Sequence, residues 1–292
     1  MVKTRDIPFY ASAVEGFVNG LKSQGYDAGK VDTVMIALTG NAKKDRQSIH
    51  DHLPGAQLVF AVGTDAACLV SDEQSSVPEV FTMVVDPVHL HLVKSLDNPG
   101  GSATGSTLVV NAGKQLDQLQ QIAPAMHRIG VLYTAGDPTS IAFIDGARQA
   151  AGQLNLQIVA LPQAAASTTD SLEQLAKQVD AIWLILDPAS AGPTAMADTF
   201  AVAREHHLPV LGDSSASVHA GALLALSADV TDLGEETAQM AVPLMAGTAT
   251  AAQTQVRGPR KTTLSINLVA AEALGLSVPD SVLHLADEVI DK

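Results

Sequence analysis

Carboxylates and hydroxyls recur in this sequence directly after stretches that look like buried strands, each beside a Gly or Pro turn and ahead of a helical stretch. They are Asp6 and Tyr10, Gly63-Thr64-Asp65, Asp86-Pro87, Asp137 to Ser140, Asp187 to Ser190, and Asp213-Ser214-Ser215. Ligands of open parallel sheets bind beyond the carboxyl ends of the strands, where loops and helix N-termini offer unpaired donors. The pattern therefore predicts recognition of a small polar ligand at this edge.

A second interpretation applies to each of these residues taken singly. Asp, Ser and Thr are the residues that cap helices, and any α/β protein needs such caps. Six such groups along one common edge favour contact of some of them with a ligand. The predicted ligand-binding residues are Tyr10, Thr64, Asp65, Asp86, Asp137, Thr139, Ser140, Asp187, Asp213 and Ser214.

Known catalytic motifs are missing from the sequence. It contains no G-x-S-x-G elbow, no Walker-type phosphate loop and no G-x-G-x-x-G. Cys68 is the single cysteine, which excludes an internal disulfide, a thiolate metal cluster and a two-cysteine catalytic pair. An enzyme using Asp187 or Asp213 as acid or base stays an alternative to a binding protein, and so does a ligand-sensing regulatory domain.

Histidines occur in close pairs, and an H-x-H spacing suits a metal site on a strand. The pairs are His50 and His52, His89 and His91, and His206 and His207. They belong to different segments, and two pairs fall at predicted helix ends, where a partly cationic side chain complements the helix dipole. We therefore expect neither a metal nor a cofactor.

Strand-like and helical stretches alternate along most of the chain. The predicted strands are 31–38, 57–64, 77–85, 128–135, 156–162, 181–186, 208–213 and 222–230. The predicted helices are 9–24, 41–53, 114–122, 138–154, 169–178, 194–206 and 231–246. Continuous Val/Ile/Leu strands separated by helices indicate an α/β fold with parallel sheets that are covered on both faces.

Three segments interrupt the alternation and are interpreted as bends or crossings: 98–110, which is rich in glycine, 222–230 and 255–268. With 292 residues the chain is long enough for two cores. We predict one lobe from residues 1–107 and 227–257 and another from 108–226 and 258–292. The ligand is expected between them, enclosed by hinge closure.

Charge and hydropathy exclude some partners. The chain has 31 acidic and 17 basic residues, for a formal net charge of −14, so its field repels phosphate backbones and nucleic acid is not an expected partner. No apolar run approaches the ~20 residues that span a bilayer. The first residues, MVKTRDIPFY, lack the apolar stretch of a secretory signal.

Several stretches, in this order and spacing, resemble one known family. They are IPFYASAVEGFVNGLKSQGY (7–26), AVGTDAA (61–67), VFTMVVDPV (80–88), NPGGSATG (98–105), IGVLYTAGDPTS (129–140), DAIWLILDPAS (180–190), PVLGDSSASVHAGALLAL (209–226), DLGEETAQMA (232–241), LSINLVAAEALGL (264–276) and LADEVI (285–290). In them the chain resembles the substrate-binding proteins of ABC transporters of the tryptophan/tyrosine type, a branch of the type I periplasmic-binding fold with two Rossmann-like lobes.

The resemblance implies an exported receptor, expected to be a monomer, that delivers a small solute such as an amino acid to a membrane permease. A signal or lipoprotein segment would then lie upstream of the sequence given. The family's ligand contacts correspond to Thr64 and Asp65, Asp86, Thr139 and Ser140, Asp187, and Asp213 and Ser214.

Two loops depart from the family pattern. Thr139-Ser140 stands where aromatic-amino-acid binders usually have Asn-Ser, and Asp187-Pro188 stands where they have Asp-Asn. An Asn offers both a donor and an acceptor to an amino-acid head group, which Thr and Pro cannot replicate. The resemblance therefore predicts a receptor and leaves open which solute it binds.

Overall fold

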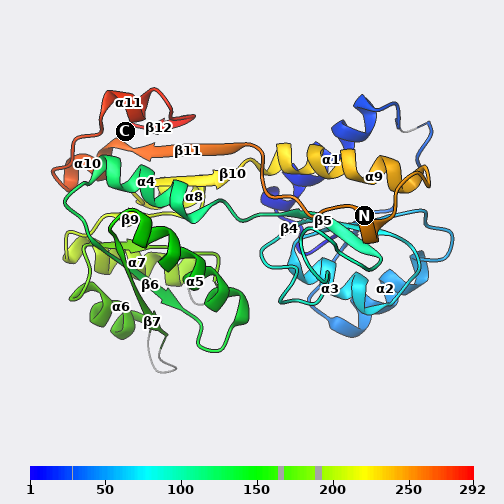
Figure 1. Cartoon of the computed structure of the whole chain (residues 1–292), viewed down its shortest axis with the longest axis horizontal. Helices are drawn as coiled ribbons and strands as arrows, with labels where there is room; N and C mark the ends of the chain where they lie inside the picture. Colours follow the sequence, from blue (N-terminus) through cyan, green and yellow to red (C-terminus); the bar gives the residue numbers. More distant parts are fainter. Residues whose placement is uncertain (28, 164–167, 188–192) are drawn as a thin grey trace. The chain divides into compact units, whose positions relative to one another are not determined.

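The computed structural model describes residues 1–27, 29–163, 168–187 and 193–292, and two compact units make up the chain (Figure 1). Unit 1 comprises Met1–Val109 and Ala228–Lys261, and unit 2 comprises Val110–Ser227 and Thr262–Lys292. The chain passes between the units three times. The predicted α/β class, with two lobes, mostly parallel sheets and three crossings, is confirmed.

Unit 1 is built on a five-stranded sheet in the order β2-β1-β3-β4-β5, and its strand pairs are parallel. The strands are β1 (Val2–Lys3), β2 (Ile36–Ala37), β3 (Val59–Val62), β4 (Glu79–Val84) and β5 (Ala103–Thr107). The helices are α1 (Pro8–Ser23), α2 (Ala42–His52), α3 (Thr64–Asp72) and α9 (Val230–Met245), and a short 3-10 turn, η1, spans Ala251–Gln253.

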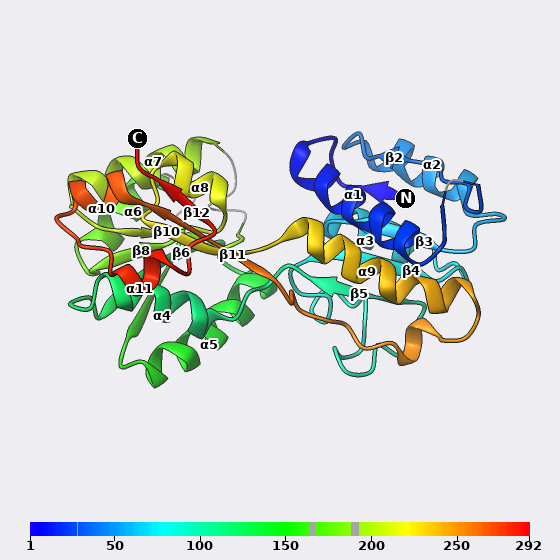
Figure 2. The same ribbon diagram turned by 90° about the horizontal axis from the view of Figure 1, so that it is seen from above.

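Alternation along the strands divides the core of unit 1 between the two faces of its sheet. Phe60 and Val62 join the cluster that α1 and α9 complete, and Val59 and Ala61 join the cluster that α2 and α3 complete. Phe17 of α1 stacks on Phe60 with ring centroids 3.7 Å apart. Figure 2 shows α1 and α9 side by side, although α1 ends at Ser23 and α9 begins only at Val230.

Unit 2 is built on a seven-stranded sheet in the order β12-β11-β10-β9-β8-β6-β7. The strands are β6 (Arg128–Tyr133), β7 (Gln157–Pro162), β8 (Ala181–Trp183), β9 (Val210–Leu211), β10 (Leu224–Ala228), β11 (Thr262–Asn267) and β12 (Glu288–Ile290). The helices are α4 (Ala112–Ile122), α5 (Pro138–Gln153), α6 (Thr168–Ala176), α7 (Pro193–Glu205), α8 (Ser215–Ala220), α10 (Leu268–Ala273) and α11 (Asp280–Leu283). Leu172, Ile182 and Val202 belong to its core.

The glycine-rich stretch 98–110 was predicted to be a bend or crossing, and that prediction is wrong for residues 103–107, which form strand β5. All five are buried, and a Cβ on Gly105 would lie 2.0 Å from the Phe81 carbonyl oxygen. Small residues here let β5 approach β4 closely. In the sequence, the same small residues and glycines are typical of a loop, which is why the strand was not predicted.

Strand β2 also differs from its prediction, since it holds only Ile36–Ala37 of the predicted 31–38. Both of its residues are only partly buried and it lies at the edge of the sheet, so little packing extends it. Among the described residues, no helix has the length and apolarity that a membrane crossing requires.

Candidate ligand-binding site

The strand ends of unit 1 bring Thr4, Arg5 and the start of α3 together. The Thr4 backbone amide donates to the Val62 carbonyl at 3.0 Å, which extends the pairing of β1 with β3. The Thr4 hydroxyl oxygen accepts from the Ala66 amide at 3.1 Å. Because the residue that precedes α3 is Gly63, which has no side chain, Thr4 supplies the cap from the neighbouring strand.

Gly63 makes this close arrangement possible. Its φ of +88° lies in the region that only glycine adopts readily. A Cβ at this position would lie 2.6 Å from the Thr4 hydroxyl oxygen and 2.8 Å from Cε1 of Tyr10. The Gly63 turn therefore holds Thr4 and Tyr10 against the N-terminus of α3, next to Thr64 and Asp65.

A pocket of about 500 Å³ opens at this edge of unit 1. It is lined by Thr4, Arg5, Leu38, Thr39, Gly40, Ala42, Asp45, Asp65, Cys68 and Leu69. Arg5 and Asp65 are exposed, and neither side chain has a hydrogen bond or ion pair within the described part of the chain. Asp45 is different, because it accepts from the amide and the hydroxyl of Thr39 at 2.9 and 2.8 Å. The pocket thus offers one cation and one anion to a ligand.

The charges at this edge influence one another and the nearby hydroxyl and thiol groups. Burial raises the pKa of the Tyr10 hydroxyl, the Asp65 carboxylate raises it further, and Arg5 opposes both effects. Burial, followed by the charges of Glu79, Asp72 and Asp65, raises the pKa of Cys68 to about 11. The Cys68 thiol is therefore uncharged near neutral pH and lacks the thiolate that a nucleophile needs.

Asp86, at the end of β4, uses its carboxylate within its own turn. One oxygen accepts from the amides of Val88 and His89 at 3.2 and 3.1 Å, and the other bonds the His89 ring. The structure thus gives Asp86 a capping role. Its predicted contact with a ligand stays a prediction.

At the strand ends of unit 2, Asp137, Ser140 and Asp187 lie together. Asp137 caps α5 by accepting from the Ser140 amide at 2.8 Å. Asp187 is 4% exposed and accepts from the Thr134 amide and hydroxyl, the latter at 2.9 Å. The Ser140 hydroxyl, itself 1% exposed, bonds both carboxylates.

That shared hydroxyl limits how the two acids can be satisfied. A serine has one hydroxyl proton, so it donates to Asp137 or to Asp187 but not to both at once. The side chain of Thr139 and all of Pro188, which also featured in the predicted site, lie outside the described residues.

Asp213 and Ser214 come together at the start of α8. The Ser214 hydroxyl donates to Asp213 at 2.9 Å and accepts from the Ser217 amide at 3.4 Å, as part of a capping box. Capping therefore accounts for Ser214 in the structure, as it does for Asp137. Ser214 and Asp137 remain predicted ligand contacts that the structure does not test.

Exposed apolar side chains accompany the polar groups at both edges. Ile7 and Phe9 are each 42% exposed beside Arg5 in the sequence, and Ile141 and Leu186 are 44% and 38% exposed beside Ser140 and Asp187. Exposed large apolar groups next to polar groups are typical of ligand sites. They can hold the apolar part of a ligand whose charged groups meet the polar residues.

Sequence reasoning missed Arg5. The predicted site residues are hydroxyls and carboxylates, mostly after long apolar runs, whereas Arg5 follows a strand of only two residues, Val2–Lys3. The signal available was its position, between that strand and a helix that begins with Pro8. A cation there is as well placed to meet a ligand as Asp65 is.

Two α/β units interleaved through three crossings, with polar side chains at the strand ends, define the class of type I periplasmic binding proteins. The family model described as "ABC transporter substrate binding protein" matches residues 7–290. The chain belongs to this family.

Known relatives agree with this assignment. A tyrosine-binding protein from Clostridioides difficile is 25% identical over 253 residues, which is 82% of this chain and 70% of that protein. The structure of an ABC domain in complex with L-Trp from Streptococcus pneumoniae is 26% identical, covers 99% of this chain and 98% of its own, and superposes with a TM-score of 0.82. A ligand-free, open substrate binding protein with adhesive properties from Clostridium difficile is 24% identical, with coverages of 100% and 98% and a TM-score of 0.84.

Proposed function

We propose that this protein is the receptor of an ABC importer and binds an α-amino acid that has a large apolar or aromatic side chain. The observation that carries the proposal is the pair of unpartnered charges, Arg5 and Asp65, that line one strand-end pocket. A zwitterion presents the complementary carboxylate and ammonium groups. The relatives described as tyrosine-binding and as bound to L-Trp support the same ligand class.

Arg5 is the residue proposed to bind the carboxylate of the ligand. Its guanidinium is permanently charged and can make two parallel hydrogen bonds to a carboxylate. The ammonium group is proposed to meet Asp65 and the acidic residues of unit 2, among them Asp137 and Asp187. The exposed apolar side chains at both edges are proposed to hold the ligand's side chain.

Strand-end residues of both units are proposed to contact one ligand. Binding then favours a closed conformation over an open one, by an amount set by the ligand's preference for the closed form. A membrane permease that distinguishes the two conformations is the proposed partner. An exported, monomeric protein on the outer side of the cytoplasmic membrane is the setting that this role requires.

Isothermal titration with L-tyrosine and L-tryptophan tests the proposal. The Arg5→Met variant is expected to weaken binding about 10- to 100-fold, because a charge-assisted hydrogen bond contributes about 1.5–3 kcal/mol. Arg46→Met is the matched control, since Arg46 pairs with Asp72 on the surface of unit 1 and does not line the pocket. Its affinity should equal that of the wild type.

Analogues of the ligand test each charge separately. Tyramine lacks the carboxylate and should lose affinity for the wild type but be indifferent to Arg5→Met. Desaminotyrosine lacks the ammonium group and should be indifferent to Asp65→Asn. If neither amino acid binds, or if Arg5→Met binds both as tightly as the wild type does, the proposed ligand class is wrong.

We also propose that the ligand leaves the protein chemically unchanged. Asp187 and Asp213, the acids that an enzyme could use, accept hydrogen bonds from neighbouring protein groups. Mass spectrometry of L-tyrosine and L-tryptophan after long incubation with the protein should recover only the starting compounds. A new product that depends on Asp187 or Asp213 would favour the enzyme alternative.

A further inference from the structure

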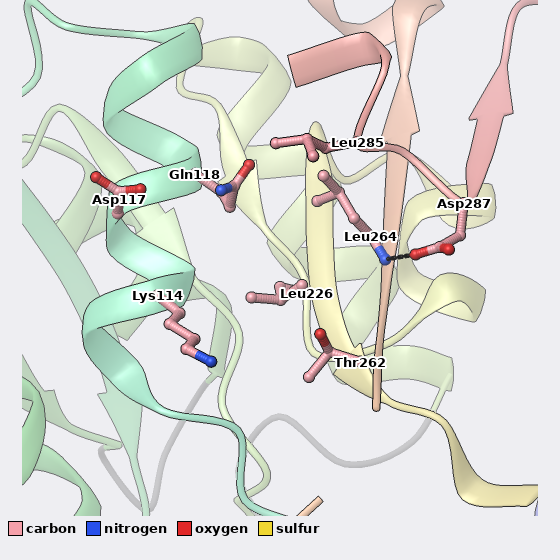
Figure 3. Close-up of a pocket in the computed structure, with 8 residues that line it drawn as sticks. All are labelled: Lys114, Asp117, Gln118, Leu226, Thr262, Leu264, Leu285 and Asp287. Atoms are coloured by element: carbon pink, nitrogen blue, oxygen red, sulfur yellow. Dashed lines mark hydrogen bonds between the residues drawn. The ribbon is translucent and has the colours of Figure 1, made fainter. Parts of the chain in front are cut away.

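A second pocket, of about 400 Å³, lies entirely within unit 2 and shares no residue with the strand-end pocket of unit 1. Figure 3 shows helix α4 on one side of it and strands β10 and β11 on the other. It is lined by Lys114, Asp117, Gln118, Leu226, Thr262, Leu264, Leu285 and Asp287. None of these residues belongs to the ligand site predicted from the sequence.

The packing of α4 explains why space remains here. Its buried side chains are Gln115, Leu116, Leu119 and Ile122, which form one helical stripe. Lys114 and Gln118, one turn apart, lie beside that stripe on the flank of the helix. In Figure 3 the Lys114 side chain extends from α4 toward the strands, and Gln118 lies across from Leu285.

Polar groups in the pocket are left without partners. The Gln118 Oε1 atom is buried and has no hydrogen-bond donor among the described residues. The Lys114 ammonium group likewise has no ion pair or hydrogen bond there. Asp287 uses one oxygen to accept from the Leu264 amide at 2.8 Å, and its second oxygen is not engaged by the described chain. An unmet buried acceptor is costly, so a donor is expected at Gln118.

The rest of the lining is apolar. Leu226 and Leu264 are 9% and 4% exposed, whereas Leu285 is 63% exposed. Figure 3 shows these three side chains around the same space, with Leu285 directed toward α4. Covering an exposed leucine of this kind with a small apolar group removes apolar surface from water, which stabilises the complex.

We propose that this pocket is a second small-molecule site, which takes a zwitterion with an aliphatic side chain, such as L-leucine. The carboxylate is held by Lys114, the ammonium group donates to Gln118 Oε1 and the free oxygen of Asp287, and the aliphatic chain packs on the three leucines. The assignment rests on the residues of this pocket alone and does not depend on the function proposed above.

The position of the pocket gives an occupant a route to influence the crossings. Leu226 precedes Ser227, where the chain leaves unit 2, and Thr262 is the first residue after the chain returns. A molecule bound here therefore contacts β10 and β11 next to two of the three crossings. Ligands that bind near such segments can bias a conformational equilibrium only if they prefer one of its states.

Methyl NMR of the full chain with labelled leucines tests the proposal. Unlabelled L-leucine at millimolar concentration should shift the methyl resonances of Leu226, Leu264 and Leu285 together, with one shared dissociation constant. Each resonance is assigned from a Leu→Met variant. Changes confined to unit 1, with these three resonances unmoved, would overturn the second site without touching the proposed function.

Variants and analogues then test the chemistry. Gln118→Met and Lys114→Met should each weaken the shared dissociation constant about tenfold, while the exposed controls Gln178→Met and Lys177→Met should leave it unchanged. Isoamylamine lacks the carboxylate and isocaproate lacks the ammonium group, so each should bind about tenfold more weakly than L-leucine. Equal binding of either analogue, or of the Gln118 and Lys114 variants, would refute the zwitterion assignment.

Discussion

Glu79 begins strand β4 with a carboxyl group that is almost completely buried, and its Oε1 has no hydrogen-bond partner in the described chain. It points to the same face of the sheet as Phe81, two residues on, which α2 and α3 cover. Burial raises its pKa well above the ordinary value of 4.5. A neutral acid avoids the cost of an isolated buried charge.

The Glu79→Gln variant should remove a pH dependence from the stability of the protein. The pKa of Glu79 is raised in the folded state, so above pH 4.5 the unfolded chain loses its proton first. Stability from this group is complete below that pH and falls above it, by up to about 1.4 kcal/mol per pH unit, until the pH reaches the folded pKa. Urea unfolding across this range measures the effect, with Gln expected to flatten the curve.

Glu272→Gln is the control for that measurement, because Glu272 is exposed on helix α10. Its pH profile should follow that of the wild type. Parallel profiles for the wild type and Glu79→Gln above pH 4.5 would mean that Glu79 ionises as easily in the folded protein as in the unfolded chain.

At the residue scale, sequence reasoning predicted which side chains lie at the strand ends better than it predicted what they do there. Asp65 follows a long apolar strand and a Gly turn, and these two signals placed it at the edge of the sheet. The partners of Asp137 and Asp187 could not be predicted, because they depend on which loops the sheet order brings together. Neither could the unpaired state of Arg5, which is a property of its neighbours in space.

Helices α1 and α9 pack through small residues, so their backbones come into close contact. A Cβ on Gly234 would lie 2.1 Å from the Ala13 carbonyl oxygen, and one on Gly16 would lie 1.9 Å from the Thr231 carbonyl oxygen. Figure 2 shows the resulting pair on one face of the sheet of unit 1. Since α1 starts near the strand-end pocket of unit 1 and α9 starts at the second crossing, the close pair links these two regions of unit 1.

Gly234→Ala should therefore destabilise the protein, although alanine is the better helix former. Overpacking against a backbone oxygen costs about 1–3 kcal/mol, which outweighs a helix-propensity gain of about 1 kcal/mol. Denaturant unfolding followed by far-UV circular dichroism measures the difference. Gly146→Ala is the control, because a Cβ at this exposed position of α5 meets nothing within 4 Å.

Gly146→Ala should stabilise the protein by up to about 1 kcal/mol, the reverse of the effect at Gly234. If both substitutions were stabilising, the close approach of α1 and α9 would have no energetic consequence. The opposite signs test packing, since helix propensity alone predicts the same sign at both positions.

At the element scale, the long amphipathic helices were predictable because their apolar spacing is strong. Helix α1 spans Pro8–Ser23 where 9–24 was predicted, and α5 spans Pro138–Gln153 where 138–154 was predicted. Strand β5 was not predictable in this way. Gly105 and its small neighbours form no apolar pattern in the sequence, and they are buried because they fit closely against β4. Strand formation by such residues depends on tertiary contact.

For the whole molecule, the three crossing segments are tied to one another on the side of unit 1. The Thr107 amide donates to the Arg257 carbonyl at 2.8 Å, and the Asp229 amide donates to the Lys261 carbonyl at 3.2 Å. Arg260 makes two hydrogen bonds to the buried Asp232, at 2.8 and 2.7 Å, and these bonds lower the pKa of the Asp232 carboxyl group. These bonds fix the ends from which the chain leaves unit 1.

A ligand that contacts both units should stabilise both of them against unfolding. The single tryptophan allows the effect on unit 2 to be measured. Trp183 lies in unit 2, is 2% exposed and packs edge-on against Phe143, so its fluorescence reports the unfolding of unit 2. At about 100 times its dissociation constant, L-tyrosine should stabilise the folded state by about 2.7 kcal/mol. The Trp183 melting curve should then move up by about 5–10 °C.

At the same L-tyrosine concentration, Arg5→Met should reduce this stabilisation to about 0.4–1.4 kcal/mol, because binding is 10- to 100-fold weaker. The Trp183 shift should shrink accordingly even though Arg5 lies in unit 1. Circular dichroism, which reports both units, provides the comparison. If L-tyrosine raised the melting temperature of unit 1 by circular dichroism and left the Trp183 curve in place, the ligand would be held by unit 1 alone. The acidic residues around Ser140 would then serve only to cap and order their own loops.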